Sequence, residues 1–254
     1  MTKTSESQKT TYVLFIVEGK SDQHALEPSI KKLYEKVAPN KVVEFIMITE
    51  NGDKTGGDIT SKRNVTKSNI EQNIKKFILN PCLRGYMPKS ILPSIEEIIH
   101  IVDLDGAFIP DEKIMEDKSV SRIKYETENI VCKDRNEAIK RNKRKRDNLE
   151  HLISLGEFIY SGHPMKYHVY YFSSNLDHFL HNDANLDDRQ KTSAADLFAD
   201  TYNYPQKFVS FFLDKQNPTH DMSYKESWEY VKHGTNSLAR GTNLNVLIKR
   251  LWEE

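Results

Sequence analysis

Two apolar runs in the chain each end in acidic residues, and this feature most constrains the fold. The first run, residues 13–17, is followed by Glu18, and the second, residues 98–102, is followed by Asp103 and Asp105. Short continuous apolar runs are typical of strands that are buried on both faces of a parallel sheet. Because the carboxyl ends of parallel strands meet at one edge, we expect the three acids to lie there together.

A divalent cation is the ligand that such a group of acids would bind. Crowded carboxylates repel one another and stay ionised only when a cation neutralises them, and hard oxygen ligands favour Mg²⁺ or Mn²⁺. The two cysteines, Cys82 and Cys132, are widely separated and have no zinc-like spacing to histidine. The sequence therefore predicts a Mg²⁺ site, with Mn²⁺ as a second possible ion and no zinc.

Each acidic motif has a simpler interpretation when it is taken alone. An acid that follows a strand and precedes glycine is a common solvent-exposed turn. Here both motifs follow strand-like runs and both lead into glycine, at Gly19 and at Gly106. Both also fall where open α/β sheets place their ligands, and this coincidence favours the metal site over two unrelated turns.

The remaining apolar patterns indicate alternating strands and helices. Further strands are expected at residues 42–48, 157–160 and 167–172, and helices at residues 22–36, 67–79 and 126–155. This alternation predicts an α/β fold, with a mostly parallel sheet and helices on both faces. Only helices are expected after Ser173, at residues 176–181, 194–202, 205–213, 224–232 and 243–252. We therefore predict a catalytic domain over residues 1–172, with a flexible tail over 1–10, and a helical C-terminal subdomain over 173–254.

The two motifs together resemble a known family. A hydrophobic strand with E-G-x-x-D, followed later by a strand ending in D-x-D-G, is similar to the Toprim fold of topoisomerases, primases, recombination proteins and small nucleases. The matching residues here are Glu18, Gly19, Asp22, Asp103, Asp105 and Gly106, and the resemblance covers roughly residues 12–172. It implies a Toprim-like sheet in which Glu18, Asp103 and Asp105 are catalytic and, with Asp22, bind the metal ion. Lys20 could be held by Asp22 at the same site.

A later segment, residues 167–183, is similar to the strand, S-N pair and acid-bearing helix of RloB-like Toprim proteins of bacterial phage defence. That family usually continues S-N-P-C-F-E, whereas this chain reads Ser174, Asn175, Leu176, Asp177, His178 and Phe179, so the late acid is displaced. Asn175, Asp177 and His178 are therefore possible additional site residues. The alternative is ordinary capping of a helix by Ser174 or Asn175.

The resemblance also implies an activity and partners. Toprim proteins of the defence branch are Mg²⁺-dependent nucleases paired with an ABC-type ATPase, so we expect a toxic endonuclease of an abortive-infection system that hydrolyses RNA, such as tRNA, or DNA. Relaxation of DNA or primer synthesis is disfavoured, because the covalent tyrosine domain and the zinc and polymerase modules of those enzymes are not evident in 254 residues. A second class of function remains open, in which a non-catalytic Mg²⁺-binding subunit regulates a partner ATPase.

Positive charge is concentrated in one expected helix, although the chain as a whole has 37 basic and 37 acidic residues. The candidate nucleic-acid contacts in this helix are Lys140, Arg141, Lys143, Arg144, Lys145 and Arg146. A cationic helix face can bind phosphates by releasing counterions, or it can be a solvated face whose lysine stems cover apolar surface.

A glycine-containing loop is expected at residues 49–64, after the second strand. Its glycines, Gly52, Gly56 and Gly57, and its cations, Lys54, Lys62 and Arg63, could cradle a phosphate, or the loop could be a simple linker. It lacks the spacing of a P-loop, so ATP hydrolysis by this chain is not predicted. The chain also lacks an apolar stretch long enough to cross a bilayer and an apolar leader, so we expect a cytoplasmic protein without membrane contact.

Overall fold

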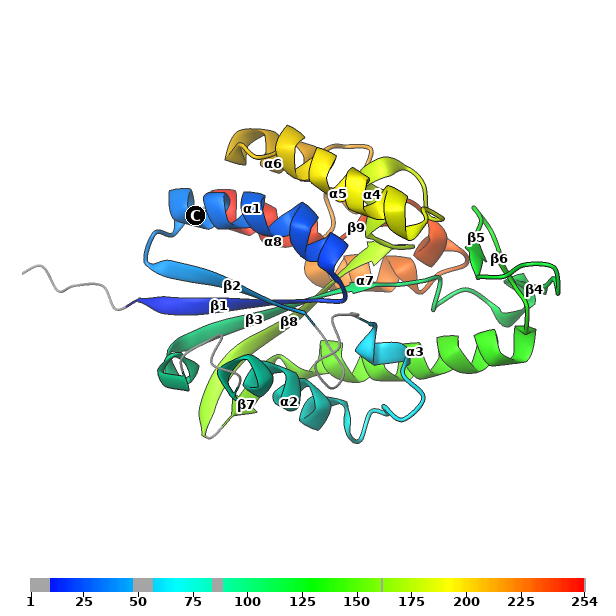
Figure 1. Cartoon of the computed structure of the whole chain (residues 1–254), viewed down its shortest axis with the longest axis horizontal. Helices are drawn as coiled ribbons and strands as arrows, with labels where there is room; N and C mark the ends of the chain where they lie inside the picture. Colours follow the sequence, from blue (N-terminus) through cyan, green and yellow to red (C-terminus); the bar gives the residue numbers. More distant parts are fainter. Residues whose placement is uncertain (1–9, 48–56, 84–88, 161, 254) are drawn as a thin grey trace, which may run out of the picture.

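The computed structural model describes residues 10–47, 57–83, 89–160 and 162–253 of the chain. Its centre is a sheet in the order β2-β1-β3-β8-β7, in which β9 also pairs with β8 (Figure 1). The strands are β1 (Thr11–Val17), β2 (Lys41–Met47), β3 (Ile95–Asp103), β7 (Glu157–Tyr160), β8 (His163–Ser173) and β9 (Gly241–Thr242). Four of them, β1, β2, β3 and β8, are mutually parallel, whereas β7 and β9 run antiparallel to β8. The predicted α/β class with a mostly parallel sheet is confirmed.

Strand β3 lies in the middle of the parallel region, and its residues are buried nearly throughout because both of its faces are covered. Ile99 pairs with Phe15 of β1 on one side and with His168 of β8 on the other. At the end of the strand, Asp103 pairs with Phe172. The carboxyl ends of β1, β3 and β8 therefore lie at one edge of the sheet, as parallel pairing requires.

Helices cover both faces of the sheet, as predicted (Figure 1). One face is packed by α1 (Lys20–Val37), α4 (Leu176–His181), α5 (Asp188–Thr201), α6 (Pro205–Phe212) and α8 (Leu244–Glu253). The other is packed by α2 (Ile70–Leu83), α3 (Arg135–Leu155) and α7 (Tyr224–Val231). Helices that follow Ser173 thus share hydrophobic clusters with the sheet itself on each face. Among the described residues, no helix is both long enough and apolar enough to span a bilayer.

The expected helix over residues 126–155 is wrong in its first third. Residues 130–132 form strand β6 (Ile130–Cys132), which pairs with β4 (Ile114–Glu116) and β5 (Lys124–Tyr125) in a separate three-stranded sheet. Helix α3 begins only after Asp134, whose side chain accepts a hydrogen bond from the Glu137 N–H and caps the helix. The sequence Ile-Val-Cys favours a strand because β-branched side chains fit a pleated surface better than a helix.

A buried histidine in β3 links the stability of the fold to pH. The His100 side chain is fully buried, and its Nδ1 lies 2.7 Å from the Tyr167 hydroxyl. Burial disfavours the charged imidazolium and lowers the pKa of His100 to about 4. The unfolded chain therefore binds a proton at His100 more readily than the folded chain does, and stability contributed above pH ~6.5 is lost as the pH falls towards 4.

We expect the His100→Gln variant to lack this contribution. Between pH 7 and pH 4, the free energy of unfolding should fall by on the order of 1–3 kcal/mol more in the unmodified chain than in the variant. Urea unfolding at several pH values measures both slopes. The exposed His163 provides a matched control, His163→Gln. Equal slopes for the unmodified chain and His100→Gln would contradict the assignment.

Candidate metal centre

Three acidic residues lie at the ends of the central parallel strands. Glu18 directly follows β1, Asp103 is the last residue of β3, and Asp177 lies in the first turn of α4, just after β8. The Asp103 N–H donates to Glu18 Oε1 at 3.1 Å, and the Leu176 N–H donates to Asp103 Oδ1 at 2.8 Å. These two bonds link the ends of three neighbouring strands, so the predicted convergence of Glu18 and Asp103 is present in the fold.

Helix α1 adds a fourth acid to the same edge. Asp22 lies in its first turn, and its Oδ2 accepts a hydrogen bond from the Gly19 N–H at 2.8 Å. An acid in the first helical turn is favoured there by the free N–H groups and by the helix dipole. Lys20 begins the same helix, and its side chain is exposed. The E-G-x-x-D spacing thus places one acid on the strand end and the next on the helix that follows it.

The D-x-D-G motif forms a tight turn in which two consecutive residues have left-handed backbone conformations. Asp105 has φ 52° and Gly106 has φ 64°. Aspartate tolerates this region better than most residues do, and glycine adopts it without strain. A Cβ on Gly106 would also lie 2.7 Å from Leu238 Cδ2 and 2.8 Å from Ile130 Cδ1. In this turn, Asp105 contacts Lys145 and Arg141 of helix α3.

Helix α3 holds this turn through four side chains on one face. Contacts to the turn come from Arg141 to Asp105 O at 3.0 Å, Asn142 to Gly106 O at 3.1 Å, Lys145 to Asp105 Oδ2 at 2.8 Å, and Arg146 to Ala107 O at 2.9 Å. The spacing of these residues, i, i+1, i+4 and i+5, keeps them on one side of the helix. The expectation that Lys145 contacts nucleic acid is therefore wrong, because this side chain has 0% exposure.

Lys145 is paired with two acids from different parts of the chain. Its Nζ lies 2.8 Å from Asp105 Oδ2 and 2.8 Å from Asp58 Oδ2. Asp58 caps the short 3₁₀ helix Ile59–Ser61 by accepting from the Thr60 N–H. The second oxygen of Asp105, Oδ1, accepts from the Tyr125 hydroxyl at 2.8 Å. Both oxygens of Asp105 are therefore engaged by donors within the protein.

The segment after β8 combines a capping residue with a second ion pair. Asn175 Oδ1 accepts from the His178 N–H at 2.9 Å and caps α4, which is the alternative role raised by the sequence. His178 is half-buried, with Nδ1 3.3 Å from Ser174 Oγ. Asp177 is buried and pairs with Lys191 of α5 at 2.9 Å. Of the three possible additional residues, Asp177 is the one whose carboxylate lies in the electrostatic neighbourhood of Asp22.

The pKa values divide the acids into two groups. Burial, with repulsion from Asp58, raises the pKa of Glu18 well above its usual range, and burial with repulsion from Asp22 does the same for Asp103. Burial also raises the pKa of Asp22 to about 6. Asp105 differs, because Lys145 and Arg141 outweigh the effect of burial and lower its pKa to about 2. The charge on Asp105 is thus compensated within the protein, whereas the charges on Glu18, Asp22 and Asp103 are not.

Glu18, Asp22 and Asp103 are consequently the acids best suited to hold a hard divalent cation. Each accepts a backbone hydrogen bond through one oxygen, and the other oxygen accepts none from the residues that the structure describes, so it could contact a metal ion. Within the described ranges, no group of three or more His, Cys, Asp or Glu side chains is already arranged around a metal position. Carboxylates without a cation repel one another and turn to N–H and ammonium donors, and this is the arrangement observed.

Three residues of the site have no counterpart among the sequence predictions: Asp58, Lys191 and Tyr125. Asp58 directly follows the glycine pair Gly56 and Gly57, and this position in a polar loop is the only local signal for it. Of the loop residues expected to cradle a phosphate, Gly52, Lys54 and Gly56 lie outside the described residues. Lys191 and Tyr125 are single polar residues whose partners are distant in sequence.

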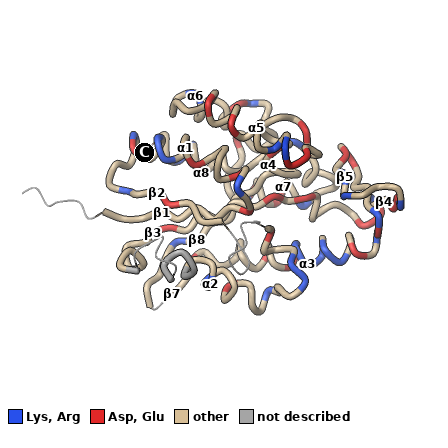
Figure 2. Tube along the Cα trace, in the orientation of Figure 1, with Lys and Arg blue, Asp and Glu red and all other residues tan. Residues whose placement is uncertain are grey.

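A basic groove lies beside the acids, between α3, the loop that follows the first 3₁₀ helix, and the three-stranded sheet. Its volume is about 480 Å³, and two acids, Asp134 and Glu137, contribute to its wall. The basic residues that line it are Lys62, Arg63, Arg122, Lys133, Arg141 and Arg144. Arg144 also lines a neighbouring cavity of about 390 Å³ with Lys67, Lys140 and Lys143. Figure 2 shows the positive charge concentrated along α3.

Arg141 connects the groove to the acids. It lines the groove, and its guanidinium also donates to Asp105 O at 3.0 Å and to the Tyr125 hydroxyl at 3.3 Å. Lys140 and Lys143 are exposed, and Arg144 is half-buried and donates to Ser61 O at 2.8 Å. The predicted basic helix therefore has one side turned to the acids and another side turned to the groove.

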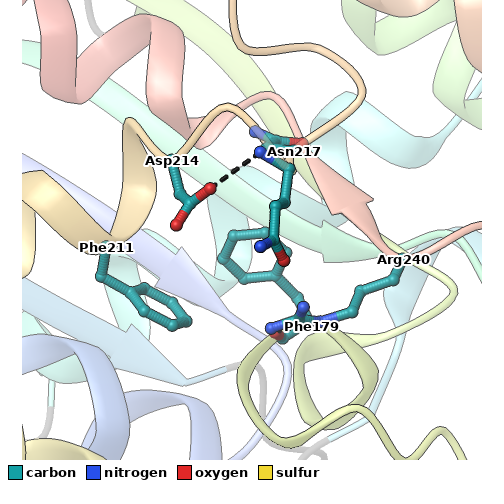
Figure 3. Close-up of a pocket in the computed structure, with 6 residues that line it drawn as sticks. Phe179, Phe211, Asp214, Asn217 and Arg240 are labelled. Carbon is teal, nitrogen blue, oxygen red and sulfur yellow. Dashed lines mark hydrogen bonds between the residues drawn. The ribbon is translucent and has the colours of Figure 1, made fainter.

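A smaller cavity of about 90 Å³ lies between α4, the end of α6 and the loop that follows α6 (Figure 3). Phe179, Phe211, Asp214 and Arg240 line it. The Arg240 guanidinium lies 5.8 Å from the centre of the Phe179 ring, and its Nε donates to Phe179 O at 3.0 Å. These contacts attach Phe179, and with it helix α4, to Arg240, and α4 also carries Asp177.

Comparisons with protein-family models, with curated proteins and with solved structures found no match for this chain. The resemblance to Toprim proteins therefore rests on the motif residues alone. Function has to be argued from the geometry of the strand ends and from the groove beside them.

We expect Gly106→Ala to destabilise the fold by about 1–3 kcal/mol, because alanine is strained at this left-handed position and its Cβ meets two side chains. Gly57→Ala is a matched control, since among the described atoms a Cβ there would meet Lys62 Cε alone, at an ordinary 3.8 Å. Thermal unfolding of both variants tests this expectation. Similar unfolding temperatures for the two would show that the left-handed turn is not required.

Proposed function

We propose that this chain is a Mg²⁺-dependent nuclease, able to use Mn²⁺, that hydrolyses phosphodiester bonds at the edge where β1 and β3 end. The observation that carries the proposal is the hydrogen bond between Glu18 Oε1 and the Asp103 N–H, which places two uncompensated acids side by side. Asp22 joins them from α1. Hard oxygen donors in this number suit Mg²⁺.

Glu18, Asp22 and Asp103 would hold the metal ion, which when bound polarises the phosphate and stabilises the leaving oxygen. Glu18 has a second possible role. Its raised pKa suits a general acid or base that gives or takes a proton at the carboxyl oxygen not bonded to Asp103. Asp105 would act indirectly, because it anchors Lys145 and Tyr125 and so shapes the wall of the site.

The basic groove would bind the phosphate backbone of the substrate. A nucleic-acid strand has to be held electrostatically beside an acidic centre that would otherwise repel it. The groove has six Lys or Arg residues against two acids in its lining, and Arg141 borders both the groove and the acids. A strand in the groove would therefore reach the metal centre at Arg141.

The biological setting that we propose follows from the family resemblance. The chain would be the toxic effector of an anti-phage, abortive-infection system, it would cleave RNA such as tRNA or DNA, and it would work with an ABC-type ATPase. The exposed Leu197 on α5 and Tyr204 next to α6 lie on the outer helices and offer apolar contacts for such a partner.

A regulatory subunit that binds Mg²⁺ without catalysis is the second candidate. Lys145 and Lys191 already neutralise Asp58, Asp105 and Asp177. In the described part of the chain, no three ligands are arranged around a metal position, and this is what a purely structural network of ion pairs would show. Metal-dependent cleavage of RNA or DNA by the purified chain separates the two candidates.

We expect Asp103→Asn and Glu18→Gln each to reduce metal-dependent cleavage by at least about 100-fold. Stability should not fall, because each change removes a half-buried acid that is repelled by its neighbours and keeps an oxygen that can accept the backbone hydrogen bond. Cleavage of labelled RNA and DNA and thermal unfolding, measured on the same preparations, provide both readouts.

Glu96→Gln is the matched control for these variants. Glu96 lies near the opposite end of β3, where it pairs with Lys41 at 3.1 Å. If the nuclease needs a cellular trigger, expression of the chain should be toxic in its host and Glu18→Gln should relieve the toxicity. Unchanged cleavage or toxicity in both the Glu18 and the Asp103 variants would refute the proposed centre.

We expect charge reversal in the groove to weaken binding of nucleic acid. In a chain that also carries Asp103→Asn, Arg63→Glu with Lys133→Glu should lower the affinity and reduce the slope of log K against log salt by about 1–2. Both residues are exposed. Fluorescence anisotropy with a labelled strand measures these quantities. Lys207→Glu with Lys249→Glu, on α6 and α8 at the other face of the sheet, makes the same change in net charge and should have little effect.

A further inference from the structure

Lys145 is a cation enclosed within the acidic centre. Its side chain has 0% exposure, and its ammonium lies at 2.8 Å from one oxygen each of Asp58 and Asp105. These partners come from a loop after β2 and from the turn after β3, so the ion pairs join three separate segments. A buried lysine keeps its charge only where acids compensate the loss of water, and here two acids contact it directly.

Both oxygens of each acid that contacts Lys145 are engaged, in a hydrogen bond or in an ion pair. Asp105 accepts from Lys145 through Oδ2 and from Tyr125 through Oδ1. Asp58 contacts Lys145 through Oδ2, and its Oδ1 accepts from the Thr60 N–H at 2.7 Å and from the Thr60 hydroxyl. A metal ion at this position would have to displace the buried ammonium from both acids.

Asp22 and Asp103 have no such direct contact with a buried ammonium among the described residues. Asp22 and Asp103 each accept one backbone hydrogen bond, through Asp22 Oδ2 and Asp103 Oδ1. The nearby cation, Lys191, is 34% exposed and pairs only with Asp177 among the ion pairs of the described residues. An exchangeable cation can therefore approach Asp22 and Asp103 without displacing a buried charge.

We infer that the Lys145 ammonium permanently takes the place of a second divalent cation, so that this centre binds one metal ion and not two. This inference rests on the proposed function, because it concerns the same centre. The single exchangeable ion would be held by Glu18, Asp22 and Asp103, while Lys145 provides a fixed positive charge beside it. Lys145 is thus a positioning residue, which orients Asp105 and keeps one fixed positive charge between Asp58 and Asp105 at any concentration of metal ion.

Counting bound Mn²⁺ tests the inference without any measurement of activity. The full chain is titrated with Mn²⁺, and binding is monitored by calorimetry and by the electron paramagnetic resonance signal of free Mn²⁺. We expect one bound ion per chain. Lys145→Met removes the ammonium and frees Asp58 and Asp105, so it should give two ions. A count of two in the unmodified chain, or a count that stays at one in Lys145→Met, would overturn the inference.

Further variants keep the test decisive if Lys145→Met does not fold. Asp58→Asn and Asp105→Asn should each retain one Mn²⁺, because neither residue holds the exchangeable ion, whereas Asp103→Asn should bind none. Loss of Mn²⁺ from the Asp105→Asn chain would overturn the inference while the metal centre of the proposed function stands. No binding by the unmodified chain would overturn both, so the two failures can be told apart.

Discussion

Repulsion among carboxylates at one sheet edge is the constraint on which the rest of this structure depends. Parallel pairing of β1, β3 and β8 brings Glu18, Asp103 and Asp177 to the same edge, whatever the chemistry there requires. Such acids are tolerated in a buried position only when donors or cations face them. The described structure supplies backbone N–H groups to Glu18 and Asp103 and an ammonium to Asp177. The hydrogen bond from the Gly19 N–H to Asp22 at the start of α1 and the ion pairs of Lys145 and Lys191 likewise place donors or cations against these acids.

The negative charges of these acids are not compensated equally, and the difference between them is seen in their pKa values. Asp105 has its pKa lowered to about 2 by Lys145 and Arg141, which outweigh the effect of burial, so it is ionised in any ordinary buffer. Glu18 and Asp103 have raised pKa values, because burial and neighbouring acids outweigh the donors that they have. Binding of a divalent cation would lower both values and release protons. The free energy held in these unfavourable charges therefore favours metal binding, as pKa shifts at functional sites often do.

The sequence predicts those parts of the site that depend on strand ends. Glu18 and Asp103 can be placed because an apolar run identifies a buried strand, and parallel strands align their carboxyl ends. Asp58, Tyr125 and Lys191 could not be placed, since each is a lone polar residue in a loop, a short strand or a helix, and its partner is fixed only by tertiary packing. The start of α3 was missed for a related reason. The basic run is helical, but the β-branched residues before it form β6 of a small sheet whose strands are only 2 or 3 residues long.

Helix α3 shows that the residues of a basic run need not all be exposed to solvent. The period of the helix divides its basic residues between two sides, one that contacts the acids and one that lines the basic groove, where we propose that a phosphate backbone binds. Arg141 and Lys145, four residues apart, turn to the D-x-D-G turn, whereas Lys140 and Lys143 are exposed. Because one rigid helix carries both sets, a strand that shifted α3 on entering the groove would also move Lys145 against Asp58 and Asp105. In the proposed nuclease, substrate binding in the groove and the charge balance around Lys145 would thus be mechanically connected through a single helix.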